Sequence, residues 1–153
     1  MPGVVRWHQL RTRMMGGDIL VDVHVMVDEK ISVSEGHFIS EQVDRALHEA
    51  FATVKDVTVH IDHEDDEFHT ISANLPNRNT LLAKINSSTS SCTASDAIVD
   101  VVLHYSKGEL IVDLIFLQEK ITEPRTWQAI KTEYKSIILA FPEVKDVRVL
   151  LAL

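Results

Sequence analysis

The sequence contains one cysteine, Cys92, among 153 residues. A single thiol cannot form a disulfide within the chain, and such scarcity is typical of a reducing compartment. No apolar stretch reaches the roughly 18–20 residues that a membrane-spanning helix requires. The opening segment, residues 1–13, carries charges where a secretory signal needs an apolar run. The sequence therefore predicts neither a disulfide scaffold nor a membrane span.

Positive charge is also scarce. The 15 lysines and arginines are outnumbered by 23 acidic residues, which gives a formal net charge of -8. This charge argues against a nucleic-acid partner, because phosphates require a basic surface. The acidic balance, together with eight histidines, instead suits the binding of cations. The acidic run over residues 63–69 is by itself typical of a solvated loop.

The most informative stretch is the strictly alternating segment 57–62, VTVHID. A period of two is typical of a half-buried strand, so the valines and the isoleucine are predicted to face a core. His60 and Asp62 then share the opposite face, with Cβ atoms about 6–7 Å apart. An imidazole and a carboxylate at this spacing can share one divalent cation or flank a pair of cations. The alternative is a solvated strand face, because so short a motif is weak evidence.

A second alternating segment, residues 19–27, has β-branched residues at all of its odd positions and is the clearest strand in the sequence. These odd positions are predicted to be buried, which places His24 on the outer face. The residues Gly16-Gly17-Asp18 predict a hairpin turn, because glycine supplies the positive φ that a tight turn needs. The hairpin joins this strand to an earlier one, residues 4–13, which contains His8.

A helix is predicted to follow, capped by Ser32 or Ser34 and ending near Phe51. His37 and His48 lie on its polar face, and for His48 a solvated position is favoured. The resulting order is strand, hairpin, strand, helix, strand. Packing one helix on one face of a small antiparallel sheet is an economical way to bury both apolar surfaces.

The sequence divides into a first unit, residues 1–66, a linker, 67–96, and a second unit, 97–153. The length suits two very small domains as well as one ordinary domain. A short helix can begin behind Pro76. The Ser- and Thr-rich stretch after it, residues 86–95, has the composition of a flexible linker.

The second unit repeats the first. Val21-Asp22 recurs 91 residues later as Val112-Asp113, and Val54-Lys55-Asp56-Val57 recurs 90 residues later as Val144-Lys145-Asp146-Val147. Two copies of one supersecondary unit explain this better than chance. The second copy loses the polar outer face, since the positions of His24, His37, His60 and Asp62 hold Ile115, Trp127, Leu150 and Ala152. It is therefore predicted to be structural, without metal ligands, and to have its apolar outer face covered.

The polar residues of the first unit occur in a specific order. His8 opens the segment HQLRTR, His24 follows Val21-Asp22-Val23, His37 lies in the helix, and VTVHID closes the unit. This combination resembles the cytoplasmic C-terminal domain of cation diffusion facilitator transporters, over residues 2–62. The resemblance implies an αββαβ fold and a role in regulating divalent cation efflux. Together with the repeat, it predicts the α+β class, with ferredoxin-like or metallochaperone-like (α)ββαβ units in two tandem copies.

The resemblance also implies a set of metal ligands. In zinc-transporting members of the family, these positions hold metal at the interface of a homodimer of such domains. Carried over one by one, the candidate ligands are His8, His24, His37, His60 and Asp62. Imidazoles and a carboxylate suit Zn²⁺. Without thiolates, such a site should discriminate poorly against Cd²⁺, Co²⁺ and Ni²⁺.

The implied assembly is a homodimer, or an intrachain pseudo-dimer in which the second copy takes the partner's place. His37 leaves from a helix on the inner face of the sheet, whereas His24, His60 and Asp62 leave from the outer face. A partner molecule could therefore supply His37.

The family's membrane-spanning helices have no counterpart in the sequence, and neither has the helix that precedes the segment Pro2-Gly3-Val4. The sequence thus corresponds to the cytoplasmic domain of a membrane transporter or to a stand-alone cytosolic metal sensor. We expect a binding function and not an enzyme. A metal-dependent hydrolase is the remaining alternative, in which a catalytic metal would keep one position open for water.

Overall fold

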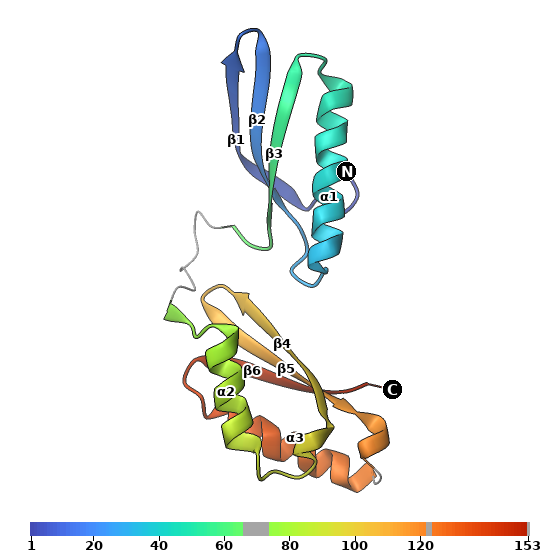
Figure 1. The fold of residues 1–153 in the computed structure, drawn as a ribbon, viewed down its shortest axis with the longest axis vertical. Coiled ribbons are helices and arrows are strands. Elements are labelled where there is room, and N and C mark those ends of the chain that lie inside the picture. Colours follow the sequence, from blue (N-terminus) through green and yellow to red (C-terminus); the bar gives the residue numbers. More distant parts are fainter. Residues whose placement is uncertain (66–73, 122–123, 153) are drawn as a thin grey trace. The chain divides into compact units, whose positions relative to one another are not determined.

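The computed structural model describes residues 1–65, 74–121 and 124–152. The chain divides into two compact units, Met1–His69 and Thr70–Leu153, whose elements are labelled in Figure 1. Each unit contains the order strand, hairpin, strand, helix, strand and a three-stranded sheet. The predicted α+β class, with ferredoxin-like ββαβ units in two tandem copies, is confirmed. Residues 66–69 of the acidic stretch and 67–73 of the expected linker lie outside the described residues.

The N-terminal unit contains β1 (Arg6–Met15), β2 (Asp18–Met26), α1 (Val33–Ala50) and β3 (Val54–Asp62). The strand order is β1-β2-β3, in which β1 and β2 are antiparallel and β2 and β3 are parallel. The sheet is therefore mixed, and the expectation of an antiparallel sheet is wrong for the pair of β2 and β3. The reason is the connection, since α1 carries the chain back to the end of the sheet at which β2 began.

Local sequence explains how β2 presents its two faces. Gly16 and Gly17 have φ values of 64° and 100°, as a two-residue hairpin turn requires. From this turn, strict alternation sends the odd-numbered valines of β2 towards α1, where they are buried with Ile39. The even-numbered residues, including His24, leave from the face that points away from α1.

The start of α1 is packed closely on the end of β3. Ser32 caps the helix by accepting a hydrogen bond from the backbone N–H of Glu35 at 3.1 Å. Gly36 in the first turn approaches Ile61 so closely that a Cβ on this glycine would lie 3.2 Å from the Cγ2 atom of Ile61. The missing side chain therefore lets the helix hold the end of β3, the strand on which Asp62 lies.

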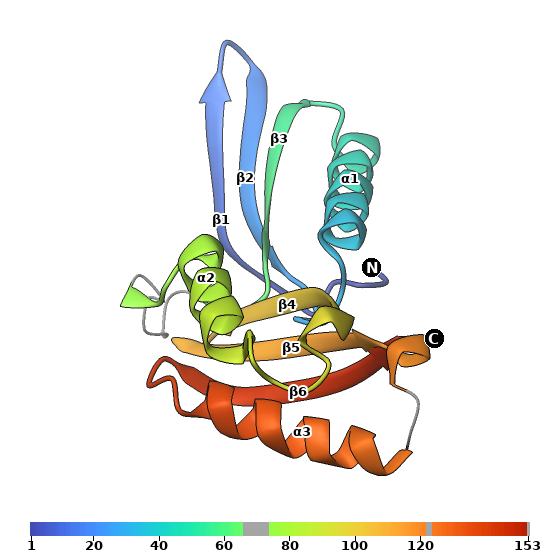
Figure 2. The same cartoon turned by 60° about the horizontal axis from the view of Figure 1, so that its bottom comes forward.

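The C-terminal unit has the same core elements, with an additional helix, α2, that precedes them in the sequence (Figure 2). Its strands follow the order β4-β5-β6, antiparallel and then parallel as in the first unit. Among the described residues, no helix is both long and apolar enough to cross a membrane. The elements are α2 (Arg78–Thr89), the 3-10 helix η2 (Ser95–Ala97), β4 (Ile98–Ser106), β5 (Glu109–Leu117), the 3-10 helix η3 (Gln118–Lys120), α3 (Pro124–Leu139) and β6 (Val144–Ala152).

Residues 67–96 are expected from the sequence to form a linker, but α2, which lies within this range, is part of the second core. Leu81 and Ile85 are fully buried, in one cluster with α3 and the even-numbered side chains of β5. Thr89 is only 2% exposed, and its hydroxyl donates to the carbonyl oxygen of Ile85 at 2.9 Å. This internal hydrogen bond lets a polar residue enter an apolar core. Within the described residues, 78–97 therefore belong to the C-terminal unit.

Candidate metal centre

Strand pairing lines up three histidines across the outer face of the N-terminal sheet. In the antiparallel pair, His8 of β1 lies opposite His24 of β2. In the parallel pair, His24 lies opposite His60, and Met26 lies opposite Asp62 of β3. Paired residues point to the same face of a sheet, so all three strands contribute polar groups to one surface.

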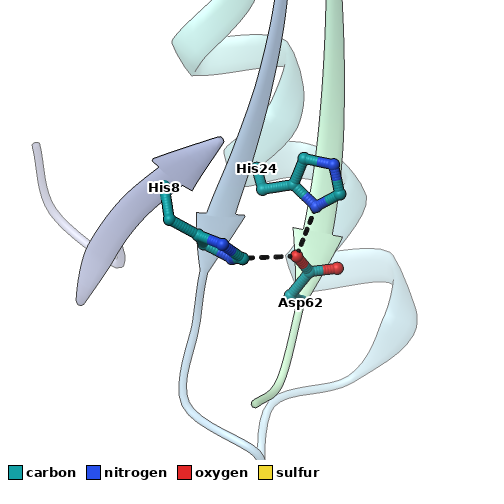
Figure 3. A group of neighbouring side chains, drawn as sticks. All are labelled: His8, His24 and Asp62. Atoms are coloured by element: carbon teal, nitrogen blue, oxygen red, sulfur yellow. Dashed lines mark hydrogen bonds and ion pairs between the residues drawn. The ribbon is translucent and has the colours of Figure 1, made fainter. Parts of the chain in front are cut away.

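Three of these side chains converge on one point, as Figure 3 shows. The Oδ2 atom of Asp62 lies 2.7 Å from Nδ1 of His24 and 3.2 Å from Nε2 of His8. One possible ligand atom from each residue lies within 4.8 Å of the other two. The side chains of His8, His24 and Asp62 are 9%, 25% and 16% exposed, so the group is partly shielded from solvent.

This geometry fits a small divalent cation. Bond lengths of about 2.0–2.2 Å to nitrogen and oxygen place the ligand atoms of one tetrahedral Zn²⁺ about 3.3 Å apart. The contacts of 2.7 and 3.2 Å between these groups are near that separation, so small side-chain movements would open a site. Two imidazoles and one carboxylate leave a fourth position for another ligand or a water molecule.

A bulge in β1 separates His8 from the residues that follow it. The register shifts between His8 and Arg11, and Gln9 has a φ of 48°. Because of this extra residue, Arg11 lies opposite Asp22 on the outer face. Simple alternation from His8 would have placed Leu10 at that position. Bulges of this kind re-aim side chains and increase the local twist of a strand.

The other two candidate ligands lie outside the converging group. The ring of His60 stacks on the ring of His24, with centroids 4.5 Å apart and an interplanar angle of 16°. His60 is therefore a neighbour of the group without contributing to it. His37 projects from α1, is 72% exposed, and pairs with Glu41 at 3.3 Å between Nε2 and Oε1. Since α1 covers the inner face of the sheet, His37 is separated from the three residues by the sheet itself.

His48 illustrates a histidine that is engaged locally. Its Nδ1 atom lies 3.0 Å from the carbonyl oxygen of Asp44, one helical turn earlier in α1. This hydrogen bond raises the pKa of His48 above its usual value. The contact accounts for His48 without a metal.

Sequence reasoning missed one residue beside the site, Asp65. It lies in the stretch that was expected to be a solvated loop, but its side chain is only 11% exposed. Its carboxylate forms an ion pair with Arg6, and its Oδ1 atom lies 4.0 Å from Nδ1 of His8. The available signal was an acidic run directly after the strand that ends with Asp62.

The C-terminal unit has a different outer face. Asp113 of β5, 7% exposed, is held by the guanidinium of Arg148 at 2.5 and 2.8 Å and lies 3.2 Å from Nε2 of His104. Among the described residues of both units, the group of His8, His24 and Asp62 is the only one of three or more potential metal ligands this close together. The ion pair of Asp113 and Arg148 instead resembles a structural contact.

Residues 1–64 match the family model described as "Cation efflux protein, cytoplasmic domain". Metal tolerance protein C1 of Arabidopsis thaliana is 40% identical over 60 residues, which cover 39% of this chain and 13% of that protein. The cation-efflux pump FieF of Yersinia enterocolitica is 34% identical over 61 residues, covering 40% of this chain and 20% of the pump. The match thus spans a fifth or less of these relatives.

Solved structures of the MamM CTD also match. One variant is 31% identical with a TM-score of 0.39, covering 40% of this chain and 76% of that chain. Another, titled as a nickel form, is 28% identical with a TM-score of 0.40, covering 42% of this chain and 81% of that chain. The sequence matches confirm that the N-terminal unit resembles the cytoplasmic domain of cation diffusion facilitator proteins.

Proposed function

We propose that the N-terminal unit, a domain of the cation efflux cytoplasmic type, binds a divalent cation and uses it to regulate efflux by a membrane transporter. The observation that carries this proposal is the convergence of two imidazole nitrogens and one carboxylate oxygen within 4.8 Å. They come from three different strands, so an ion would join β1, β2 and β3 at one end of the sheet. The domain would act on the cytoplasmic side of the membrane.

Zn²⁺ is the metal that we propose, with His8, His24 and Asp62 as its ligands. Borderline nitrogen donors and one carboxylate suit Zn²⁺, whereas a site for Mg²⁺ or Ca²⁺ would be built from oxygen atoms. The lack of a thiolate in this group predicts that Cd²⁺, Co²⁺ and Ni²⁺ bind to the same residues. In this proposal His60, whose ring stacks on that of His24, would supply the fourth ligand after a change of rotamer.

We expect Zn²⁺ affinity to fall between pH 8 and pH 6. The neutral imidazole is the ligand form, so protons compete with the metal below the ordinary histidine pKa of about 6.5. Isothermal titration calorimetry at the two pH values measures the change, with the double variant His8→Ala and His24→Ala as the control. An affinity that is the same at both values would exclude histidine ligation.

We further propose that two chains assemble with this end of the sheet at their interface and that the partner contributes His37. Within one chain, the sheet separates His37 from the other candidate ligands, but a symmetric pair of chains can exchange this residue across an interface. A metal that binds only the paired state shifts the equilibrium towards the pair by mass action.

Sedimentation equilibrium with and without Zn²⁺ tests the assembly. We expect the mass to rise from monomer towards dimer on addition of Zn²⁺, and His37→Ala to weaken that shift. His48→Ala is the matched control, since this histidine lies on the same helix and bonds to Asp44. A monomeric mass together with strong metal-induced stabilisation would favour the intrachain pseudo-dimer. Equal behaviour of the two variants would exclude a role for His37.

A further inference from the structure

The imidazole of His8 is held in an unusual state, because only one of its two nitrogen atoms has a partner. Nε2 lies 3.2 Å from Oδ2 of Asp62. Nδ1 is buried and has no hydrogen-bond partner among the described residues. A neutral imidazole carries one N–H group and one lone pair. With the proton on Nε2, where Asp62 can accept it, the buried Nδ1 atom presents only a lone pair.

Metal binding through Nε2 would reverse this arrangement. The lone pair must then be on Nε2, which faces the converging group, and the proton must be on Nδ1. Nδ1 would become a buried N–H donor, and a buried donor without an acceptor is unfavourable. The metal-bound form of His8 therefore needs an acceptor that the metal-free form does not need.

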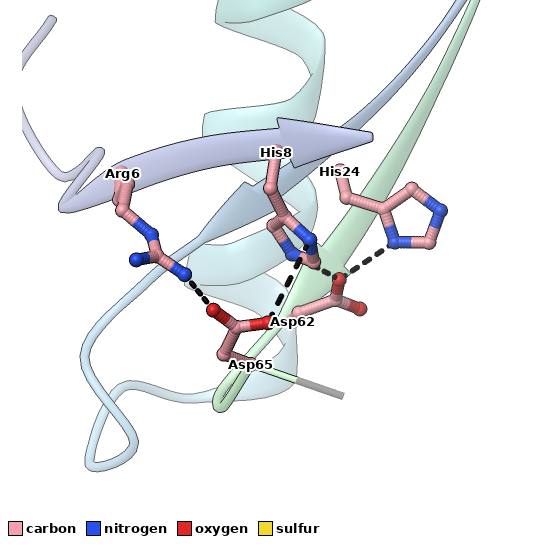
Figure 4. Close-up of polar contacts among 5 residues, drawn as sticks. All are labelled: Arg6, His8, His24, Asp62 and Asp65. Atoms are coloured by element: carbon pink, nitrogen blue, oxygen red, sulfur yellow. Dashed lines mark hydrogen bonds and ion pairs between the residues drawn. The ribbon is translucent and has the colours of Figure 1, made fainter. Parts of the chain in front are cut away.

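Asp65 is positioned to be this acceptor, as Figure 4 shows. Its Oδ1 atom lies 4.0 Å from Nδ1 of His8, and its Oδ2 atom is paired with the guanidinium of Arg6. The ion pair orients the carboxylate, so that one oxygen contacts Arg6 and the other faces the imidazole. A hydrogen bond requires about 2.7–3.2 Å, which a movement of roughly 1 Å would achieve. The side chain of Asp65 is 11% exposed, so little water competes for the contact.

We infer that Asp65 is a positioning residue for the metal site, which accepts the Nδ1–H of His8 and thereby fixes the tautomer that binds metal through Nε2. This inference rests on the proposed metal-binding function. A histidine that ligates a metal commonly donates its other N–H to a carboxylate, and loss of such an outer partner typically weakens metal binding by about 10–100-fold.

Calorimetric titration of the full chain with Zn²⁺ tests the inference. We expect Asp65→Ala to weaken binding by about 10–100-fold. Asp65→Asn should recover much of this loss, because the amide oxygen can still accept the hydrogen bond. Asp44→Ala is the matched control, since it removes a carboxylate that lies 3.4 Å from a different histidine, His48, and should leave the affinity unchanged. An affinity of Asp65→Ala and Asp65→Asn within twofold of the wild type would overturn the inference.

The tautomer provides a second readout that a purely structural role would not change. In the Zn²⁺-loaded wild type, long-range proton–nitrogen NMR spectra should assign the His8 proton to Nδ1. Coordination of Zn²⁺ through Nδ1 of His8 would overturn the inference. Asp62→Ala distinguishes the proposed metal-binding function from the role of Asp65. If Asp62→Ala abolishes Zn²⁺ binding while Asp65→Ala does not weaken it, the proposed function stands and the role of Asp65 falls. If the wild type binds no Zn²⁺, both fall together.

Discussion

Replacing Asp62 with alanine is expected to remove nearly all of the stabilisation that Zn²⁺ gives to the N-terminal unit. A metal at 100 times its Kd raises the free energy of unfolding by about 2.7 kcal/mol. Asp62 contacts both His24 and His8 through one oxygen, so its loss leaves two imidazoles without their common partner. Urea unfolding with and without Zn²⁺, followed through the backbone amide NMR signals of each unit, measures the difference.

Two further alanine variants serve as comparisons for Asp62→Ala. His60→Ala should retain part of the stabilisation, because His60 stacks on His24 and is not one of the three converging residues. His48→Ala should retain all of it, since that side chain is bonded to the backbone of Asp44. If the stabilisation survives in Asp62→Ala, the metal is bound elsewhere.

Leu81→Ala is expected to lower the free energy of unfolding of the C-terminal unit by about 2–5 kcal/mol, as large-to-small changes in a core do. Leu81 is fully buried in the cluster formed by α2, α3 and β5. Since a small domain is stable by only about 5–15 kcal/mol, this loss is a large part of the total. Denaturant unfolding measures it through the amide signals of residues 97–152.

The exposed residue Asn86 of the same helix provides the control. Asn86→Ala should be neutral or slightly stabilising, because alanine is the better helix former. The Zn²⁺-induced stabilisation of the N-terminal unit should be unchanged by Leu81→Ala. A loss below about 0.5 kcal/mol, the usual range for surface positions, would mean that α2 lies outside the core, as a linker helix would.

The sequence determined the faces of the elements and the repetition of the unit. The alternation in residues 19–27 was sufficient to predict the burial of the odd-numbered valines, because the side-chain period of a strand is a local property. The same periodicity put His24, His60 and Asp62 on one face. Pairs such as Val21-Asp22 and Val112-Asp113 revealed the second copy before its strands were seen.

Local sequence was insufficient for α2 because its buried stripe is short and partly polar. Leu81, Ile85 and Thr89 follow one another at intervals of four, and the last of them lies in a stretch rich in Ser and Thr. The hydroxyl of Thr89 enters the core only because it bonds to the carbonyl oxygen of Ile85. That local hydrogen bond becomes favourable once α2 packs against β5 and α3, which composition alone does not indicate.

Only the tertiary structure decided which of the polar residues meet. His8, His24 and Asp62 are brought together by an antiparallel pairing, a parallel pairing and the register of each. The same strands leave His60 stacked beside the group and His37 beyond the sheet, although all five residues were equal candidates in the sequence. Asp65 is likewise expected from the sequence to lie in a solvated loop, because its contacts with Arg6 and His8 of β1 are between residues far apart in the sequence. A contact between strands depends on register, on bulges and on the path of the connecting helix, and none of these is a property of a single strand.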